Sequence, residues 1–228
     1  MTILFDAGGT LVHLDHRLLQ KHLRHAGFPV SLQAVRRAEY AAKAEIDQRM
    51  KAAVADNDET RRRPYLATLF GELAVERLVA ARLTEELDRI HARHNLWRVV
   101  LPSTAQVLAN LQAQGITLGV ISNADGRIGT ILEQCRIRQF FDVLIDSSEV
   151  GIEKPDPRIF HLALAQANAS PKQALFVGDI YSIDIIGAQR AGIPALLLDT
   201  LDCYKGVECE KIRHLRELQT RRHLWQTA

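Results

Sequence analysis

The stretch ILFDAGGTLV, residues 3–12, begins as an apolar run and then stops at a charged residue. A short apolar run bounded by turn residues is typical of a strand inside a sheet. Asp6 stands where this strand, Thr2–Phe5, should end, and Gly8 and Gly9 follow it. Ligands of open parallel sheets bind beyond the carboxyl ends of the strands. Asp6 is therefore the first candidate for a functional residue.

Further apolar runs with the same character recur after residue 100. The expected strands are Thr117–Ser122, Val143–Asp146, Ala174–Gly178 and Ala195–Leu198. Helical patterns lie between them, at residues 104–114 before Gly115, from Asp156 and Pro157 onward, and at 182–191 before Gly192. Asp as a cap, Pro in the first turn and Gly after the last turn are usual helix boundaries. The alternation predicts an α/β fold with a parallel sheet covered on both faces.

Residues 15–99 have a different composition, rich in Ala, Leu, Glu, Arg and Gln, which are good helix formers. The segments LLQKHLRHAGF, LQAVRRAEYAAKAEIDQRM and LTEELDRIHARHNLW show amphipathic helical spacing. They predict an α-helical subdomain at 15–99, inserted into a core made of 1–14 and 100–228. The segment RHLRELQTRRHLW predicts a further amphipathic helix, with Trp225 docked on the core or on a second subunit.

Composition sets limits on the class of protein. The chain has 228 residues, 47% of them hydrophobic and 25% charged, which is enough apolar material for a packed core. A net charge of only +2 gives no reason to expect nucleic-acid binding. No apolar run is long enough to cross a membrane, and the first run lacks the basic leader of a secretory signal.

The cysteines point to a reducing compartment. There are three, Cys135, Cys203 and Cys209, and an odd number does not predict a disulfide framework. We therefore expect a cytoplasmic protein. Zinc sites need close paired ligands, so we expect no zinc at Cys203 and Cys209.

Polar residues gather at the predicted strand ends. Clustered carboxylates repel one another unless a cation neutralises them, and oxygen-rich clusters suit Mg²⁺. A lysine and a hydroxyl add donors for a phosphoryl group, and a carboxylate near them can attack phosphorus to form an aspartyl-phosphate. The residues concerned are Asp6, Ser122, Asn123, Lys154, Asp179 and Asp184.

Four segments in this order resemble the haloacid dehalogenase superfamily of hydrolases. They are FDAGGTL, VISNAD, GIEKPDPRIF and VGDIYSIDIIGAQRAGI, and they span nearly the whole core. The resemblance implies a Rossmann-like core with a mobile helical cap between the first and second motifs. It also implies a Mg²⁺-dependent phosphatase that acts on a small phosphorylated substrate, as a monomer or homodimer.

The resemblance assigns roles to individual residues. Asp6 matches the nucleophile, Ser122 the phosphate-binding hydroxyl with Asn123 beside it, and Lys154 the lysine that steadies nucleophile and phosphate. The metal ligands would be Asp6, Asp179, Asp184 and the main-chain carbonyl of Gly8. Thr10 matches a threonine of the loop that follows the nucleophile.

Gly8 departs from the pattern of the family's phosphatases, which usually carry a second aspartate two residues after the nucleophile. That aspartate protonates the leaving group and then activates water, and general acid–base catalysis typically contributes ~10²–10⁴-fold. The sequence therefore predicts a slow phosphatase, or one whose acid comes from elsewhere. His13 and His16 are candidates for that acid, although exposed polar residues of a hinge are the commoner interpretation.

Other activities remain open. Dehalogenation and phosphonate cleavage need no proton donor at position 8, but dehalogenases dispense with the metal acids that Asp179 and Asp184 match. Phosphonate cleavage needs a cap lysine that forms an imine, and Lys21, Lys43 and Lys51 are expected to be solvated. A non-catalytic relative that binds phosphate or a protein partner is the remaining alternative.

Two further patterns bear on which ligands the protein could bind. ETRRRPY contains Arg61, Arg62 and Arg63, which are either a clamp for an anionic substrate or a solvated helix end before Pro64. A solvated helix end is the expected outcome. DAGGTL lacks the GxGxxG pattern, so we do not expect dinucleotide binding.

Overall fold

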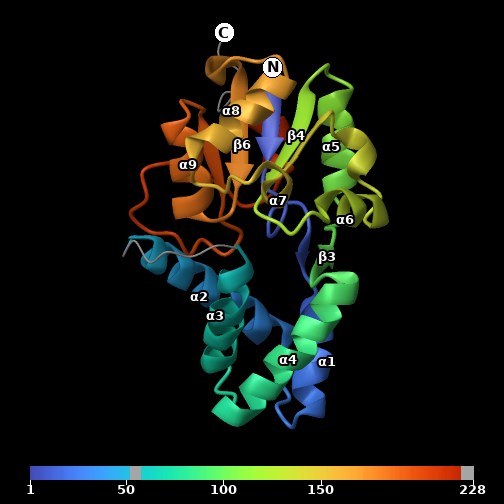
Figure 1. Ribbon diagram of the computed structural model, residues 1–228, viewed down its shortest axis with the longest axis vertical. Helices are drawn as coiled ribbons and strands as arrows, with labels where there is room; N and C mark the ends of the chain where they lie inside the picture. The colour runs from blue at the N-terminus through green and yellow to red at the C-terminus, as the bar shows by residue number, and fades with distance from the viewer. Residues whose placement is uncertain (52–57, 222–228) are drawn as a thin grey trace. The chain divides into compact units, whose positions relative to one another are not determined.

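A computed structural model describes residues 1–51 and 58–221 of the chain (Figure 1). The chain divides into two compact units. The core unit is made of residues 1–13 and 99–228, and the helical unit of residues 14–98.

The core unit contains a six-stranded parallel sheet. All five predicted strands are confirmed with the expected bounds, and the structure adds β8, whose residues EKI form no apolar run. The strand order is β5 (Val143–Asp146), β4 (Thr117–Ser122), β1 (Thr2–Phe5), β6 (Ala174–Gly178), β7 (Ala195–Leu198) and β8 (Glu210–Ile212).

Strand β1 lies in the middle of the sheet, between β4 and β6 (Figure 1). From β1 the chain builds β4 and β5 on one side, and then crosses to build β6, β7 and β8 on the other. The direction of strand order reverses at β1. In open parallel sheets such a reversal opens a crevice at the carboxyl ends of the strands, which is where ligands bind. Asp6 directly follows β1 and stands at this point.

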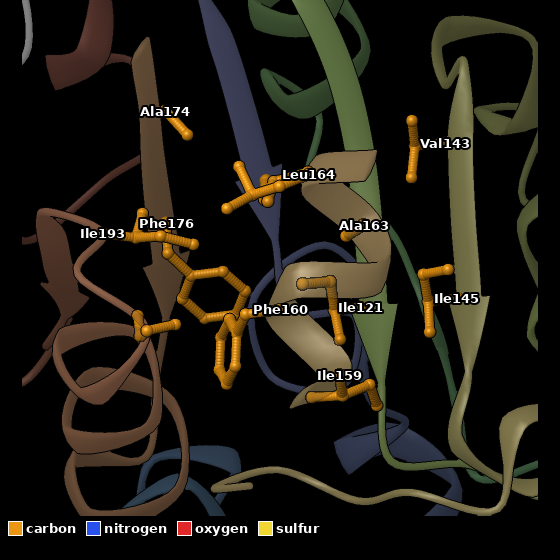
Figure 2. Packing of buried hydrophobic residues seen from close by; sticks show 13 residues of the cluster. Ile121, Val143, Ile145, Ile159, Phe160, Ala163, Leu164, Ala174, Phe176 and Ile193 are labelled. Atoms are coloured by element: carbon orange, nitrogen blue, oxygen red, sulfur yellow. The ribbon is translucent and has the colours of Figure 1, made fainter. Parts of the chain in front are cut away.

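Helix α8 (Pro157–Gln166) covers one face of the sheet. Figure 2 shows its buried Ile159, Phe160, Ala163 and Leu164 packed among side chains of β4, β5 and β6. The rings of Phe160 and Phe176 meet edge to face, with centroids 5.0 Å apart. Burying one such side chain stabilises the fold by about 1.5–3 kcal/mol. The predicted start of this helix is confirmed, because Asp156 accepts a hydrogen bond from the N–H of Arg158 and Pro157 follows it.

The opposite face of the sheet is also buried, as expected for parallel strands. Successive strand residues alternate between faces, so Ile3 and Phe5 point away from α8. Helix α5 (Thr104–Gln112) contacts β4 and α10 (Glu217–Thr220), and its buried apolar side chains are Val107, Leu108 and Leu111. Gly115 follows α5 with φ +73°, as its position predicts.

Shorter elements complete the core unit. They are α6 (Ile128–Gln134), α7 (Ser147–Val150), α9 (Ile186–Arg190), the 3₁₀ turns Arg138–Phe140 and Pro171–Gln173, and a π-helical turn at Tyr181–Ile185. The C-terminal helix is shorter than predicted within the described residues, because α10 begins at Glu217 and ends at Thr220. Trp225 lies outside the described residues.

The helical unit contains α1 (His16–His25), α2 (Leu32–Lys51), α3 (Asp58–Glu72) and α4 (Arg77–His94). Helix α2 packs against α1 and α3, and α3 packs against α4. Asp15 caps α1 by accepting a hydrogen bond from the N–H of Leu18. Strands β2 (His13–Leu14) and β3 (Trp97–Val99) pair at the two places where the chain passes between units.

The expected helix end before Pro64 is wrong. Pro64 lies inside α3, which continues to Glu72. Proline removes one backbone donor and crowds the preceding turn of a helix, so packing in the helical unit must outweigh that cost. Among the described residues, no helix is long and apolar enough to cross a membrane.

Candidate active site at the carboxyl edge of the sheet

Residues from distant parts of the chain meet at the carboxyl end of β1. Asp6 follows β1, Asp179 follows β6, Asp184 lies in the π-helical turn, and Lys154 lies in the loop between α7 and α8. All four side chains are buried. The carboxyl ends of neighbouring parallel strands lie at one edge of a sheet, which is why residues so far apart in sequence converge.

The three carboxylates form one cluster. One oxygen from each of Asp6, Asp179 and Asp184 lies within 4.8 Å of the other two. Lys154 bridges two of them, since its Nζ donates to Oδ1 of Asp6 at 2.6 Å and to Oδ1 of Asp184 at 2.8 Å. The cluster thus contains three acids and one lysine, and it has an excess of negative charge when all the acids are ionised.

The surroundings shift the protonation of this cluster. Burial raises the pKa of Asp6 well above its ordinary value, and the charges of Asp184 and Asp179 raise it further, against the opposing effect of Lys154. Burial also raises the pKa of Asp184, again against Lys154. Burial alone would lower the pKa of Lys154, but its charge and hydrogen-bond interactions with Asp184 and Asp6 outweigh it and raise that pKa. Lys154 therefore holds its proton more firmly than a free lysine, whereas Asp6 and Asp184 lose theirs less readily than free carboxyl groups.

The residues present fit a bound cation. Oδ2 of Asp6 is buried and accepts no hydrogen bond from any residue in the described part of the chain. A buried acceptor without a donor is costly unless something else satisfies it. Carboxylate oxygens are ligands for hard divalent cations. The cluster could therefore hold such an ion through Asp6, Asp179 and Asp184.

Asp184 is held by the turn that carries it. Its Oδ2 accepts hydrogen bonds from the N–H groups of Asp179, at 3.1 Å, and Ile180, at 3.0 Å. Gly178 makes this close approach possible, because a Cβ there would lie 2.4 Å from Cβ of Asp184. The prediction of a plain helix over 182–191 is wrong for its first turn, which is π-helical at Tyr181–Ile185. π turns are frequent at functional sites.

The two glycines after Asp6 differ in backbone conformation. Gly9 has φ +92°, and a Cβ there would lie 2.3 Å from Oδ2 of Asp179, so the fold requires glycine. Gly8 is half-exposed and does not belong to the glycines with positive φ. Thr10 closes the loop, since its Oγ1 donates to Oδ1 of Asp179 at 3.3 Å. Backbone conformation and close approach therefore explain Gly9, whereas no positive φ requires glycine at position 8.

Ser122 ends the neighbouring strand β4, and Asn123 follows it. Ser122 is buried at the last position of β4. The amide of Asn123 instead pairs with the main chain of Lys154: Nδ2 donates to its carbonyl at 2.9 Å, and Oδ1 accepts from its N–H at 2.8 Å. The sequence predicts Asn123 at the phosphate site and does not predict this pairing. No local pattern signals a contact between residues so far apart along the chain.

Several expectations about the helical unit are wrong. His16 is not an exposed hinge residue: it is half-buried, and its Nε2 lies 2.6 Å from Oε2 of Glu39. Lys43 is buried rather than solvated, with its Nζ 3.7 Å from Oε1 of Glu39 and 4.7 Å from the centroid of the Tyr40 ring. The spacing of Glu39 and Lys43, four residues apart on one helix face, could have signalled the pair.

The remaining candidates in the helical unit differ among themselves. Arg61 is buried, so the expectation of a solvated helix end is wrong for it. Arg62 and Arg63 both pair with Asp88, and the side chain of Arg63 is largely exposed. Lys21 is exposed, as expected. His13, which belongs to the core unit, is half-buried rather than exposed. The side chain of Lys51 lies outside the part that the structure describes.

Comparison with known proteins supports the resemblance. The family model of haloacid dehalogenase-like hydrolases matches residues 1–192. Haloacid dehalogenase-like hydrolase domain-containing protein 3 of Bos taurus is 36% identical over 118 residues, covering 52% of this chain and 47% of the relative. Glyceraldehyde 3-phosphate phosphatase of Methanothermobacter thermautotrophicus is 38% identical over 105 residues, covering 43% and 44%. Phosphoserine phosphatase of Thermus thermophilus is 30% identical over 137 residues, covering 60% and 55%.

The chain spans about half the length of these curated relatives in the matched regions. Solved structures match over nearly the whole chain and show the fold. The magnesium-bound HAD-hydrolase YfnB of Bacillus subtilis has a TM-score of 0.70 and 21% identity, covering 96% of each chain. A 2-haloacid dehalogenase of Pseudomonas syringae pv. Tomato has a TM-score of 0.59 and 24% identity, covering 99% and 100%. With the family model matched over most of its length, the chain belongs to the haloacid dehalogenase-like hydrolases.

Proposed function

We propose that this protein is a Mg²⁺-dependent phosphatase that hydrolyses small phosphorylated substrates through an aspartyl-phosphate on Asp6. The observation that carries the proposal is the buried carboxylate of Asp6, hydrogen-bonded to Lys154 and grouped with Asp179 and Asp184. This arrangement combines a nucleophile, a fixed cation and a cation-binding cluster. The phosphatases among the matched relatives support a phosphorylated substrate.

Each residue has a role in this proposal. Mg²⁺ held by Asp6, Asp179, Asp184 and the carbonyl of Gly8 would supply positive charge to the phosphoryl oxygens. Lys154 orients Asp6 through the 2.6 Å hydrogen bond and donates charge toward the phosphoryl group. Ser122, at the end of β4, offers a hydroxyl to the same group.

The reaction takes place in two steps. A carboxylate oxygen of Asp6 forms a bond to phosphorus as the bond from phosphorus to the leaving oxygen breaks. The leaving oxygen then needs a proton, which Gly8 cannot supply because it has no side chain. Water next attacks phosphorus, releases inorganic phosphate and restores the Asp6 carboxylate. Both proton transfers lack the usual partner at position 8, so the proposed enzyme is slow on substrates with poor leaving groups.

The helical unit is proposed as the cap, over residues 15–99. In this proposal, it selects the substrate, because the core cluster holds groups suited to the phosphoryl group alone. His16 is held by Glu39 within the helical unit, so it does not stand free as a replacement acid.

The test is a phosphate-release screen across phosphorylated metabolites, with and without Mg²⁺. Wild-type protein should release phosphate in the presence of Mg²⁺ and stop when a chelator is added. A matched control is Asp199→Asn. Asp199 is also buried, follows β7 at the same edge of the sheet and pairs with a lysine, Lys211, but it lies outside the cluster. That variant should stay active, whereas activity that is indifferent to chelator would contradict the proposal.

A second candidate is a non-catalytic relative that binds phosphate, and Gly8 is the observation that favours it. Such a protein would bind inorganic phosphate in the presence of Mg²⁺ but release none from any substrate in the screen. The same screen, followed by calorimetric titration with phosphate, therefore separates the two candidates.

A further inference from the structure

The side-chain amide of Asn123 pairs through both of its polar atoms with the main chain of Lys154. Its Nδ2 donates to the Lys154 carbonyl at 2.9 Å, and its Oδ1 accepts from the Lys154 N–H at 2.8 Å. A primary amide offers a donor and an acceptor side by side, so it can pair with both polar groups of one residue. We call this pair of hydrogen bonds the amide clamp.

Lys154 needs such a partner because of where it lies. It belongs to the loop between α7 and α8, outside any helix or strand whose ladder would pair its N–H and carbonyl. Its side chain is almost completely buried and contacts two carboxylates. Buried main-chain groups are nearly always hydrogen-bonded. The amide clamp supplies both bonds from the residue that follows β4.

The clamp ties the loop to a rigid part of the sheet. Strand β4 is parallel to β1 in register, with Val120 opposite Phe5, so Asn123 stands beside the end of the strand that carries Asp6. The main chain of Lys154 is thus fixed to the same edge as the carboxylate that its Nζ contacts at 2.6 Å. A shift of the loop would move Nζ away from Asp6.

We propose that Asn123 is a positioning residue, which holds the main chain of Lys154 so that its Nζ stays on Asp6 and Asp184. The inference rests on the proposed function, since it assigns Lys154 a part in the reaction. Both polar atoms of the Asn123 amide pair with Lys154, so the contacts of this side chain support a positioning role. This differs from the direct phosphate contact that its place in the sequence suggested.

The chain offers a matched control that acts on Ala124, the residue after Asn123. Oγ of Ser147 accepts from the N–H of Ala124 at 3.1 Å and donates to its carbonyl at 3.3 Å. Ser147→Ala therefore removes two hydrogen bonds from the residue after Asn123 without touching Lys154. It measures the effect of loosening this segment in general.

The experiment compares Asn123→Ala with Ser147→Ala in kinetics and in amide hydrogen exchange by NMR. Asn123→Ala should speed exchange of the Lys154 amide and lower kcat roughly 10- to 100-fold, the scale that misplaced catalytic groups produce. Its KM should change little, and Ser147→Ala should keep kcat near the wild-type value. Asn123→Asp keeps the acceptor but sets a carboxylate oxygen against the Lys154 carbonyl, so it should also speed this exchange and lower kcat, and it serves if the alanine variant does not fold.

Three results would overturn the inference. One is unchanged exchange at Lys154 in Asn123→Ala, and another is an equal loss of kcat in Ser147→Ala. The third is a raised KM with normal kcat, which would indicate that Asn123 contacts substrate directly. A wild type without phosphatase activity would count against the proposed function instead, and the exchange rate of the Lys154 amide would still decide whether the clamp exists.

Discussion

Both units bury charged side chains, but they balance the charge differently. In the core unit, the cluster of Asp6, Asp179 and Asp184 has one buried lysine, Lys154. In the described part of the helical unit, the buried acids Glu39 and Asp47 are matched by two buried bases, Lys43 and Arg61. The core cluster has an excess of negative charge, whereas the buried acids and the buried lysine and arginine described in the helical unit are equal in number.

The difference separates a binding site from internal structure. Buried charges are expensive, and opposite charges in good contact offset that cost. In the helical unit, the buried acid Glu39 has partners in the same unit, His16 and Lys43. In the core cluster, one lysine contacts only two of the three acids, and burial raises the pKa of Asp6. A cation would complete the core cluster, which is why the proposed chemistry belongs there.

The largest expected effect comes from Asp6→Asn. An amide oxygen is a poor nucleophile, so phosphate release should fall roughly 10³-fold or more, while the near-isosteric change leaves the fold intact. Steady-state kinetics and a thermal melt measure both. Near-normal turnover would show that the chemistry lies elsewhere.

The next largest effect is expected from Asp179→Ala, which removes one of the proposed cation ligands. This variant should bind Mg²⁺ at least about 10-fold more weakly, because substitutions of residues that only surround metal ligands already lower metal affinity by that factor. Calorimetric titration measures the affinity. In wild type, free Mg²⁺ at about 100 times Kd should stabilise the fold by ~2.7 kcal/mol, seen as a higher melting temperature. Equal affinities in the two proteins would contradict the metal assignment.

Gly8→Asp should raise activity instead of lowering it. It restores a proton donor next to the cluster, and kcat on alkyl phosphates could rise by ~10²-fold, the lower end for general acid–base catalysis. Aryl phosphates, whose leaving groups need little protonation, should gain less in the first step. Gly9→Ala is the matched contrast, and we expect it to destabilise the protein because its Cβ meets Asp179. A stable Gly8→Asp variant that is no faster would show that the acid is not limiting.

The smallest effect on catalysis is expected from Lys43→Met in the helical unit. Removing one partner of a buried ion pair costs about 3–5 kcal/mol, so the unfolding midpoint in urea should fall. The double variant Glu39→Gln with Lys43→Met should recover part of that stability.

Trapping of a substrate on Lys43 by borohydride would reveal an imine, and would favour phosphonate cleavage over phosphate ester hydrolysis.

Much of the core could be predicted because its signals are local. The strand Thr2–Phe5 is an apolar run that ends at a charged residue, and the start of α8 is marked by Asp156 and Pro157. Strand β8 escaped because three residues, two of them charged, contain no pattern. It forms by pairing with the neighbouring strand β7, and the local sequence does not signal that contact.

The sequence by itself determined the order of the strands along the chain and the acids that follow them, since backbone preferences and hydrophobic patterns act over a few residues. Only the tertiary structure decided which side chains meet. The clamp between Asn123 and Lys154 and the burial of Lys43 and Arg61 depend on contacts between segments far apart along the chain. Such contacts form when whole helices and strands pack, and packing is decided by the combined surfaces of many residues rather than by any one stretch.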